Sequence, residues 1–142
     1  MKTLGVVGLG LIGGSFVKAY RETKDWRVLG TDKNDKITQL AIMAEDIEAE
    51  LTHKNLHECD LVLIAVYPEA AIEYLEKNGE YISPDAMVID CCGVKRAVCD
   101  KCFKIADRYG FTYVGGHPMA GRHFSGYKYS TEELYRGAPM VI

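Results

Sequence analysis

The sequence predicts an α/β fold of the doubly wound type, with a mainly parallel sheet and helices on both of its faces. Three observations predict it. Short apolar runs alternate with amphipathic stretches along the whole chain, which is typical of successive βαβ units. The run Asp60–Val66 is apolar after its first residue, and such runs suit parallel strands that are covered on both faces. A glycine-rich turn joins the first apolar run to the first amphipathic stretch.

The positions of these runs predict the individual elements. Strands are expected over Thr3–Val7, Trp26–Thr31, Asp60–Val66, Ala86–Asp90, Phe111–Val114 and Ala138–Ile142, while Ile47–Leu51 is either a short strand or a connection. Helices are expected over Leu11–Thr23, Asp35–Ala44, Pro68–Lys77 and Val94–Tyr109. Proline suits a first helical turn and glycine a helix stop, as at Pro68 and Gly110. The segment Gly115–Ser130 lacks periodicity and is expected to be a loop.

Composition limits the classes of function. The length of 142 residues and the hydrophobic content of 48% predict one domain over residues 1–142. The net charge of -3 gives no indication of a nucleic acid or an anionic membrane as a partner. Five glycines interrupt the apolar stretch Leu4–Val17, which argues against an export signal, so a cytoplasmic location is expected.

The five cysteines form no metal or disulfide pattern. Their number is odd, and a reducing cytosol disfavours disulfides. Cys99 and Cys102 have the C-x-x-C spacing inside a predicted helix, but no second ligand pair has metal spacing. A structural zinc normally takes four ligands. The sequence therefore predicts no metal site, and buried thiols that behave as small apolar residues.

The turn after the first strand carries the motif G-x-G-x-x-G, formed by Gly8, Gly10 and Gly13 with Leu11 and Ile12 between the last two. Between a strand and a helix, this motif indicates dinucleotide binding, as in Rossmann domains. The first glycine permits the tight turn, the second lets the pyrophosphate approach the backbone, and the third lets helix and strand pack closely. The helix N-terminus offers its N–H groups to the phosphates.

Asp32 follows the second predicted strand, where an acidic residue is expected to bind the ribose hydroxyls. Its charge would repel a 2′-phosphate, which favours NAD over NADP, although Lys33 next to it could pair with that phosphate. Val66 lies in the turn between a predicted strand and helix. That turn either flanks the cofactor or is an ordinary connection.

The segment Gly115–Gly121 is the candidate catalytic stretch. Its His117 follows a predicted strand and so lies at the ligand edge of the sheet. Histidine is the usual proton-transfer residue near neutral pH, and the neighbouring glycines allow close approach to a ligand. A loop histidine with a structural hydrogen bond is the alternative, and His123 is the competing histidine.

At these motifs the chain resembles the prephenate and arogenate dehydrogenase family. The glycine turn extended through Gly14-Ser15 resembles the family fingerprint, and His117-Pro118-Met119-Ala120-Gly121 matches its HPMAG. Ser125-Gly126 matches the Ser-Gly that follows, Asp90–Lys95 resembles a strand-end motif that closes in Val-Lys, and Gly137-Ala138-Pro139 resembles the segment before the next strand.

The resemblance implies NAD-dependent oxidative decarboxylation of prephenate to 4-hydroxyphenylpyruvate, in tyrosine biosynthesis, or the corresponding reaction of arogenate. His117 would take the proton of the ring hydroxyl as hydride leaves the carbon that bears it. Gly93, Lys95 and Ser125 would lie near the substrate, and Lys95 with Arg96 could bind a substrate carboxylate or be solvated charges.

The chain departs from the family in two respects. Gly93 stands where the family usually has a serine whose hydroxyl helps to orient the histidine. The helical C-terminal domain that forms the family's homodimer and supplies a substrate-binding arginine is absent from these residues. Both departures favour the alternative of a noncatalytic NAD-binding or regulatory module. Another small-acid dehydrogenase or an imine reductase is a further alternative, which HPMAG argues against.

Overall fold

A computed structural model describes residues 1–91, 95–115, 117–118 and 140–141 of the chain, with the backbone alone for residues 95–99, 117–118 and 140–141. Six parallel strands form its central sheet, in the order β3-β2-β1-β4-β5-β6. Their bounds are β1 Lys2–Val7, β2 Trp26–Thr31, β3 Ala49–Glu50, β4 Leu61–Ile64, β5 Met87–Asp90 and β6 Thr112–Gly115.

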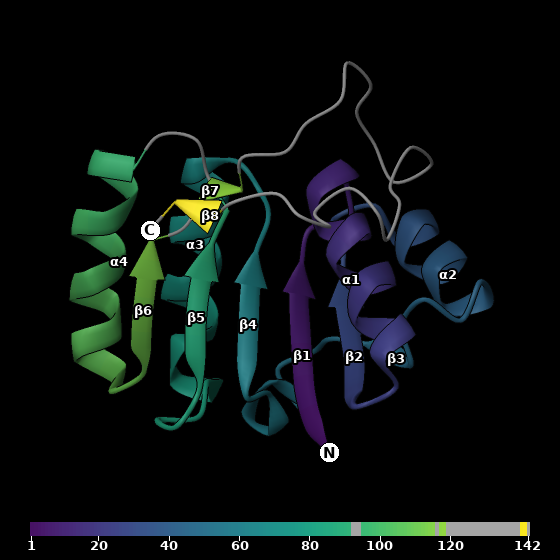
Figure 1. Cartoon of the computed structure of the whole chain (residues 1–142). Coiled ribbons are helices and arrows are strands. Elements are labelled where there is room, and N and C mark those ends of the chain that lie inside the picture. The colour runs from purple at the N-terminus through teal and green to yellow at the C-terminus, as the bar shows by residue number, and fades with distance from the viewer. Residues whose placement is uncertain (92–94, 116, 119–139, 142) are drawn as a thin grey trace.

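The helices cover both faces of this sheet (Figure 1). Helices α1 and α2 pack on one face, and α3 and α4 on the other. Their bounds are α1 Leu11–Thr23, α2 Asp35–Met43, α3 Pro68–Asn78 and α4 Lys95–Tyr109, with short 3-10 helices η1 Leu56–Glu58 and η2 Gly79–Tyr81. The doubly wound α/β fold expected from the sequence is therefore confirmed.

Alternation along the strands divides the core into two apolar clusters. In β4, Leu61 and Leu63 pack with the cluster under α1 and α2, whereas Val62 and Ile64 pack with the cluster under α3 and α4. Successive side chains of a strand point to opposite faces, so an unbroken apolar run serves both clusters. This is the physical reason why the run Asp60–Val66 is apolar after its first residue.

Most expected bounds differ from the observed ones by one or two residues. Helix α1 and strand β2 begin and end where the pattern predicted, and β3 lies inside Ile47–Leu51. Asn34 caps α2, since its side-chain oxygen accepts a hydrogen bond from the Lys36 N–H at 3.1 Å. Gly110 stops α4 with a φ of 84°, a backbone conformation that glycine adopts without steric cost.

One difference lies in the segment that was expected to be a loop. His117–Pro118 forms the short strand β7, which pairs antiparallel with β8, Met140–Val141. The two strands form a separate two-stranded sheet. A strand of two residues is too short to show periodicity, so the sequence pattern could not predict it.

Candidate functional site

The glycine turn lies at the carboxyl edge of the sheet, where the chain order reverses. From β1 the chain continues through α1 to β2 on one side, while β4 lies on the other side of β1 (Figure 1). In open α/β sheets, ligands bind in the crevice outside the carboxyl ends of the strands at such a point. The motif glycines therefore occupy the place where the fold puts its ligand site.

Gly8 makes the turn possible. It follows β1 with a φ of 93°, which a residue with a side chain adopts only with strain. An added Cβ would lie 2.4 Å from the carbonyl oxygen of Ala65 and 2.6 Å from Cγ1 of Val66. The turn after β1 is thus packed directly against the turn after β4.

Gly13 allows the first helix to pack onto that turn. A Cβ at this position would lie 1.7 Å from the carbonyl oxygen of Gly8, far closer than two non-bonded atoms can approach. Gly13 is buried in the first turn of α1. Only glycine lets α1 start this close to the end of β1, as the motif predicts.

Gly10 differs from both, because a Cβ there would meet no atom of the described residues within 4 Å. Its φ of −78° is negative, so neither space nor backbone conformation within this part of the protein requires a glycine. A position kept free of a side chain, at the start of a helix, leaves the backbone open to a ligand from outside.

The start of α1 is arranged for an anion. Gly10 is its N-cap and provides no side-chain hydrogen bond, and the first turn holds no acidic residue. Helix N-termini carry N–H groups without intrahelical partners and a positive dipole end. The expected cofactor contacts Leu11 and Ile12 are the first two residues of this helix. Such a terminus binds phosphate groups.

Asp32 follows β2 and is linked to the same turn. Its Oδ1 accepts a hydrogen bond from the Leu9 N–H at 2.9 Å, and its Oδ2 accepts one from the Asn34 N–H at 3.0 Å. Each carboxylate oxygen has two acceptor sites, so both oxygens retain capacity for ligand hydroxyls. Lys33 beside it is exposed.

A buried carboxylate that sequence reasoning did not single out lies at the end of β5. Asp90 has no exposed surface, and its Oδ1 accepts a hydrogen bond from the Tyr113 hydroxyl at 2.5 Å. The sheet register pairs Asp90 with Gly115, at the end of the strand that leads to His117. An acidic residue that ends an apolar strand at the ligand edge was the available signal.

For the remaining expected site residues, the structure gives either the backbone alone or no position. His117 begins β7 with its backbone in register with Val141, and Lys95 begins α4. Gly93 and Ser125 lie outside the described residues, as does His123. The structure therefore brings together the glycine turn, Asp32 and Val66, and it gives the backbone position of His117 and Lys95.

Other candidate chemistry is limited in this part of the chain. Cys59, Cys91 and Cys102 are buried, as the sequence predicted for thiols that act as small apolar residues. Residues 1–91, 95–115, 117–118 and 140–141 contain no group of three or more His, Cys, Asp or Glu side chains placed to hold a metal ion. None of the helices described is both long and apolar enough to cross a membrane.

A hollow of about 310 Å³ lies at the opposite edge of the sheet, far from the glycine turn. Its two arginines already have acidic partners: Arg21 binds Asp46 at 2.7 Å, and Arg27 binds Glu48. A ligand would have to replace these ion pairs, so we assign no ligand to the hollow.

Comparison with known proteins agrees with this geometry. The profile of the family described as "Prephenate dehydrogenase, nucleotide-binding domain" matches residues 16–142. A prephenate dehydrogenase of Bacillus subtilis is 33% identical over 99% of this chain. Arogenate dehydrogenase of Synechocystis has a similar structure, with a TM-score of 0.87 and 27% identity over 97% of this chain.

Prephenate dehydrogenase of A. aeolicus, solved in complex with hydroxyphenyl propionate and NAD+, has a TM-score of 0.85 and 28% identity over 99% of this chain. The chain spans 38% of the length of the Bacillus subtilis protein, 48% of the Synechocystis chain and 49% of the A. aeolicus chain. Fold, glycine turn and sequence similarity together lead to one conclusion: the chain belongs to the prephenate dehydrogenase family, as its nucleotide-binding domain.

Proposed function

We propose that this chain binds NAD and acts as the dehydrogenase domain in the oxidative decarboxylation of prephenate to 4-hydroxyphenylpyruvate, a step of tyrosine biosynthesis. Gly10 is the observation that carries the cofactor assignment. Two of the three motif glycines are required by contacts inside the protein, whereas a Cβ at Gly10 would have no atom of the described residues within 4 Å. The absence of a side chain at this position would let the pyrophosphate of the dinucleotide approach the protein backbone at the start of α1.

Asp32 supports NAD as the cofactor in preference to NADP. Its carboxylate would accept hydrogen bonds from the adenosine ribose hydroxyls at the end of β2. Because both oxygens are held by backbone N–H groups of Leu9 and Asn34, the side chain cannot turn away from a 2′-phosphate without losing these bonds. Repulsion between the two anions then disfavours NADP. Gly8, Gly13 and Val66 would line the same site.

His117 is the proposed general base. NAD, when bound, accepts the hydride that leaves the ring carbon bearing the hydroxyl. His117 would accept the proton of that hydroxyl as the carbonyl forms. Cleavage of the ring-to-carboxylate bond would then release carbon dioxide and leave an aromatic phenolate, which regains a proton to give the hydroxyl of the product. A well-placed base contributes a factor of about 10² to 10⁴ to the rate. Gly93, Lys95 and Ser125 are proposed to lie near the substrate.

Arogenate is the second candidate substrate. The similarity to the Synechocystis arogenate dehydrogenase supports it. The dehydrogenation chemistry is the same for both compounds, which differ in their side chains. A homodimer of the full-length protein is a prediction from the sequence resemblance, and a cytoplasmic location is a prediction from the glycines that interrupt the N-terminal apolar stretch.

The first test is a calorimetric titration of the purified chain with NADH and, in parallel, NADPH. We expect NADH to bind more tightly, because Asp32 accepts ribose hydroxyls and repels the 2′-phosphate. Preference for NADPH would contradict the role given to Asp32 and would indicate that Lys33 pairs with the 2′-phosphate. Binding of neither would contradict the cofactor assignment for this chain.

The second test concerns catalysis. Turnover of prephenate and of arogenate with NAD is followed at 340 nm for the wild type and for His117→Ala. The substitution is expected to remove turnover and to leave NADH affinity almost unchanged. Wild-type activity should fall at low pH, because only a neutral histidine can accept the proton. Turnover that survives the substitution, or a flat pH profile, would exclude the assigned role. NADH binding without turnover of either substrate would favour the noncatalytic alternative.

A further inference from the structure

The carboxylate of Asp32 is fixed by its surroundings before any ligand arrives. Leu9, in the glycine turn, holds Oδ1, and Asn34, at the N-cap of α2, holds Oδ2. One of these donors belongs to the β1–α1 turn and the other to the β2–α2 turn. The carboxylate therefore connects the two turns that form the adenosine side of the site.

The backbone of Asp32 is fixed as well, and Thr38 fixes it. Asp32 lies just beyond the β1–β2 register, which ends with Val7 opposite Thr31. The Asp32 N–H donates instead to Oγ1 of Thr38 at 3.0 Å, and the Thr38 hydroxyl lies 3.4 Å from the Asp32 carbonyl oxygen, to which it donates. The Thr38 hydroxyl thus forms hydrogen bonds with both the N–H and the carbonyl oxygen of Asp32.

Thr38 is not placed to touch a ligand. It lies in α2 with 1% of its surface exposed. An apolar residue such as valine would fill the same volume, but it could not accept the hydrogen bond of the partly buried Asp32 N–H. The cost of an unsatisfied buried donor explains why a hydroxyl is needed at this place.

The helix that carries Thr38 is itself secured at this end. The Asn34 side chain accepts from the Lys36 N–H at 3.1 Å, and the Asn34 carbonyl accepts from the Ile37 N–H at 3.0 Å. Asn34 therefore starts α2 and also donates its own N–H to the Asp32 carboxylate. The position of the Thr38 hydroxyl relative to Asp32 is determined by this one turn of the helix.

We propose that Thr38 is a positioning residue for the dinucleotide. Its buried hydroxyl holds the backbone of Asp32 so that the carboxylate can bind the Leu9 N–H and the cofactor ribose at the same time. Thr38 thereby contributes to the affinity for NADH and to the preference for NADH over NADPH. The inference rests on the proposed function, because it requires that Asp32 bind the adenosine ribose. It adds a residue that acts only through Asp32.

The test compares Thr38→Val and Thr38→Ser by calorimetric titration with NADH and with NADPH. Valine removes the hydroxyl at nearly constant volume, and NADH affinity is expected to fall about threefold to tenfold, the equivalent of one lost hydrogen bond. NADPH affinity falls less, because a loosened carboxylate can move from the 2′-phosphate, so the ratio between the two affinities narrows. Thr38→Ser keeps the hydroxyl and restores both values.

A double-mutant cycle separates positioning from a general loss of structure. In an Asp32→Asn background, Thr38→Val is expected to have little further effect on NADH affinity, because the two residues act as one unit. Thr23→Val is the matched control, since the Thr23 hydroxyl also donates to a backbone carbonyl, that of Tyr20 at 2.7 Å, but at the far end of α1. It should leave both affinities unchanged.

Each outcome decides between the two claims. Equal losses for NADH and NADPH, or additive losses in the cycle, would show that Thr38 has only a structural role and would overturn the inference while NAD binding stands. A wild type that binds neither dinucleotide overturns the proposed cofactor site, and the inference falls with it. If Thr38→Val does not fold, Thr38→Cys provides the same comparison, because a thiol is a weak acceptor of similar size.

Discussion

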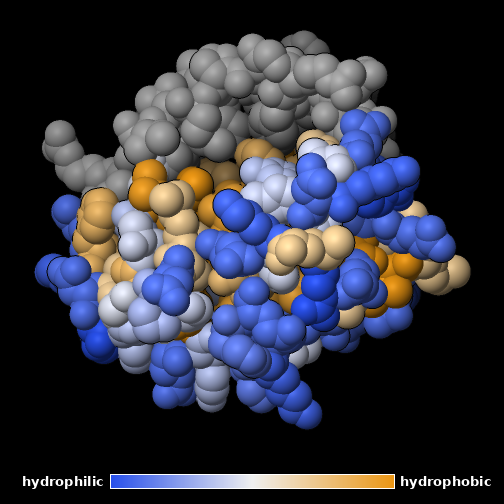
Figure 2. Space-filling model, turned by 60° about the horizontal axis from the view of Figure 1, so that its bottom comes forward, coloured by the Kyte–Doolittle hydropathy of each residue, from blue (hydrophilic) through white to orange (hydrophobic). Residues whose placement is uncertain are grey.

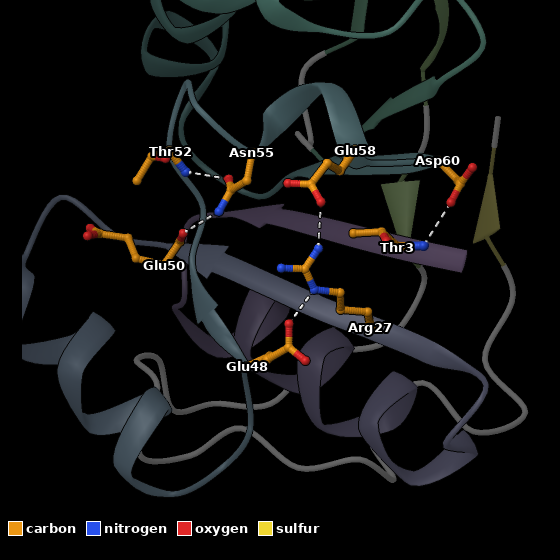
Figure 3. A network of polar contacts seen from close by, with 8 residues as sticks. All are labelled: Thr3, Arg27, Glu48, Glu50, Thr52, Asn55, Glu58 and Asp60. Carbon is orange, nitrogen blue, oxygen red and sulfur yellow. Dashed lines mark hydrogen bonds and ion pairs between the residues drawn. The ribbon is translucent and has the colours of Figure 1, made fainter. Parts of the chain in front are cut away.

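The two edges of the central sheet are built differently, although the same strands form both. At the amino edge, charged side chains bind one another: Arg27, near the start of β2, lies between Glu48 and Glu58, which precede β3 and end η1 (Figure 3). At the carboxyl edge, glycines and backbone N–H groups predominate, and among the described residues no atom lies within 4 Å of a Cβ added at Gly10. The charged side chains of the amino edge are paired with one another, whereas the carboxyl edge offers backbone groups that can bind a ligand.

The contacts at the amino edge are numerous but individually modest. Asp60, just before β4, accepts a hydrogen bond from the Thr3 N–H at 2.8 Å, whereas the contacts of Asn55 with Thr52 and Glu50 lie beyond the carboxyl end of β3 (Figure 3). Figure 2 shows this end of the molecule covered largely by hydrophilic side chains, with smaller hydrophobic patches between them. Exposed ion pairs contribute about 0.2 to 1 kcal/mol each. The comparison predicts that changes at this edge affect stability slightly and ligand binding not at all.

The largest effect is expected from Gly13→Ala, at the carboxyl edge. The new Cβ would lie 1.7 Å from the Gly8 carbonyl oxygen, so α1 must move away from the glycine turn. Such overpacking costs about 3 kcal/mol and lowers Tm by about 10 °C in a domain of this size. Thermal unfolding followed by circular dichroism measures it. An unchanged Tm would contradict the close packing of α1 on the turn.

Gly10→Ala is the matched variant in the same motif. No atom of the described residues lies within 4 Å of the added methyl group, and φ is negative, so Tm should stay within about 2 °C of the wild type. NADH affinity is expected to fall at least about tenfold, because the methyl group occupies the ligand's approach to the backbone. A variant that binds NADH normally would remove the main support for the cofactor site.

Alkaline pH should weaken the amino edge through Cys59. Burial raises the pKa of this thiol from 9.0 to about 12, and the neighbouring Glu58 and Asp60 add to the shift. Because the folded pKa lies above the unfolded one, the contribution to stability is complete below pH 9 and is lost as the pH rises toward 12. Denaturant unfolding of the wild type and of Cys59→Ala, measured across this range, should show a smaller decline in the variant. Equal declines would exclude the thiol as their cause.

The smallest effect is expected from Arg27→Met, which keeps the apolar stem of the side chain and removes both ion pairs. The free energy of unfolding should fall by about 1 kcal/mol at low salt and by less at high salt, since ions screen exposed pairs. NADH affinity should not change, because Arg27 lies at the edge opposite the glycine turn. Weaker NADH binding would contradict the claim that changes at the amino edge leave ligand binding unaffected.

Much of the fold could be predicted from the sequence because its signals are local. An unbroken apolar run located β4, the glycine motif located the turn between β1 and α1, and both were confirmed. In the site, the motif also predicted the steric roles of Gly8 and Gly13, since each depends on neighbours that every strand-turn-helix of this kind brings together.

What the sequence could not provide depends on contacts between distant residues. Thr38 reads as an ordinary helix residue, because its role appears only when α2 is folded against the end of β2. Tyr113 and Asp90 are separated by a whole helix, and their hydrogen bond needs the sheet register that pairs β5 with β6. The pairing of β7 with β8 links residues 117 and 141, and neither strand is long enough to be recognised alone.

That last pairing has a consequence for the order of events during synthesis. All six strands of the central sheet lie within residues 2–115, so the sheet can assemble before the segment that follows has left the ribosome. Strand β7, which begins with His117, receives its partner only once Val141 has been made. Chains grow at about 5 to 20 residues per second, so for a second or more the nascent protein can hold a complete dinucleotide fold while the backbone of its histidine is still unpaired. On this timing the binding half of the site precedes the half proposed to carry the chemistry.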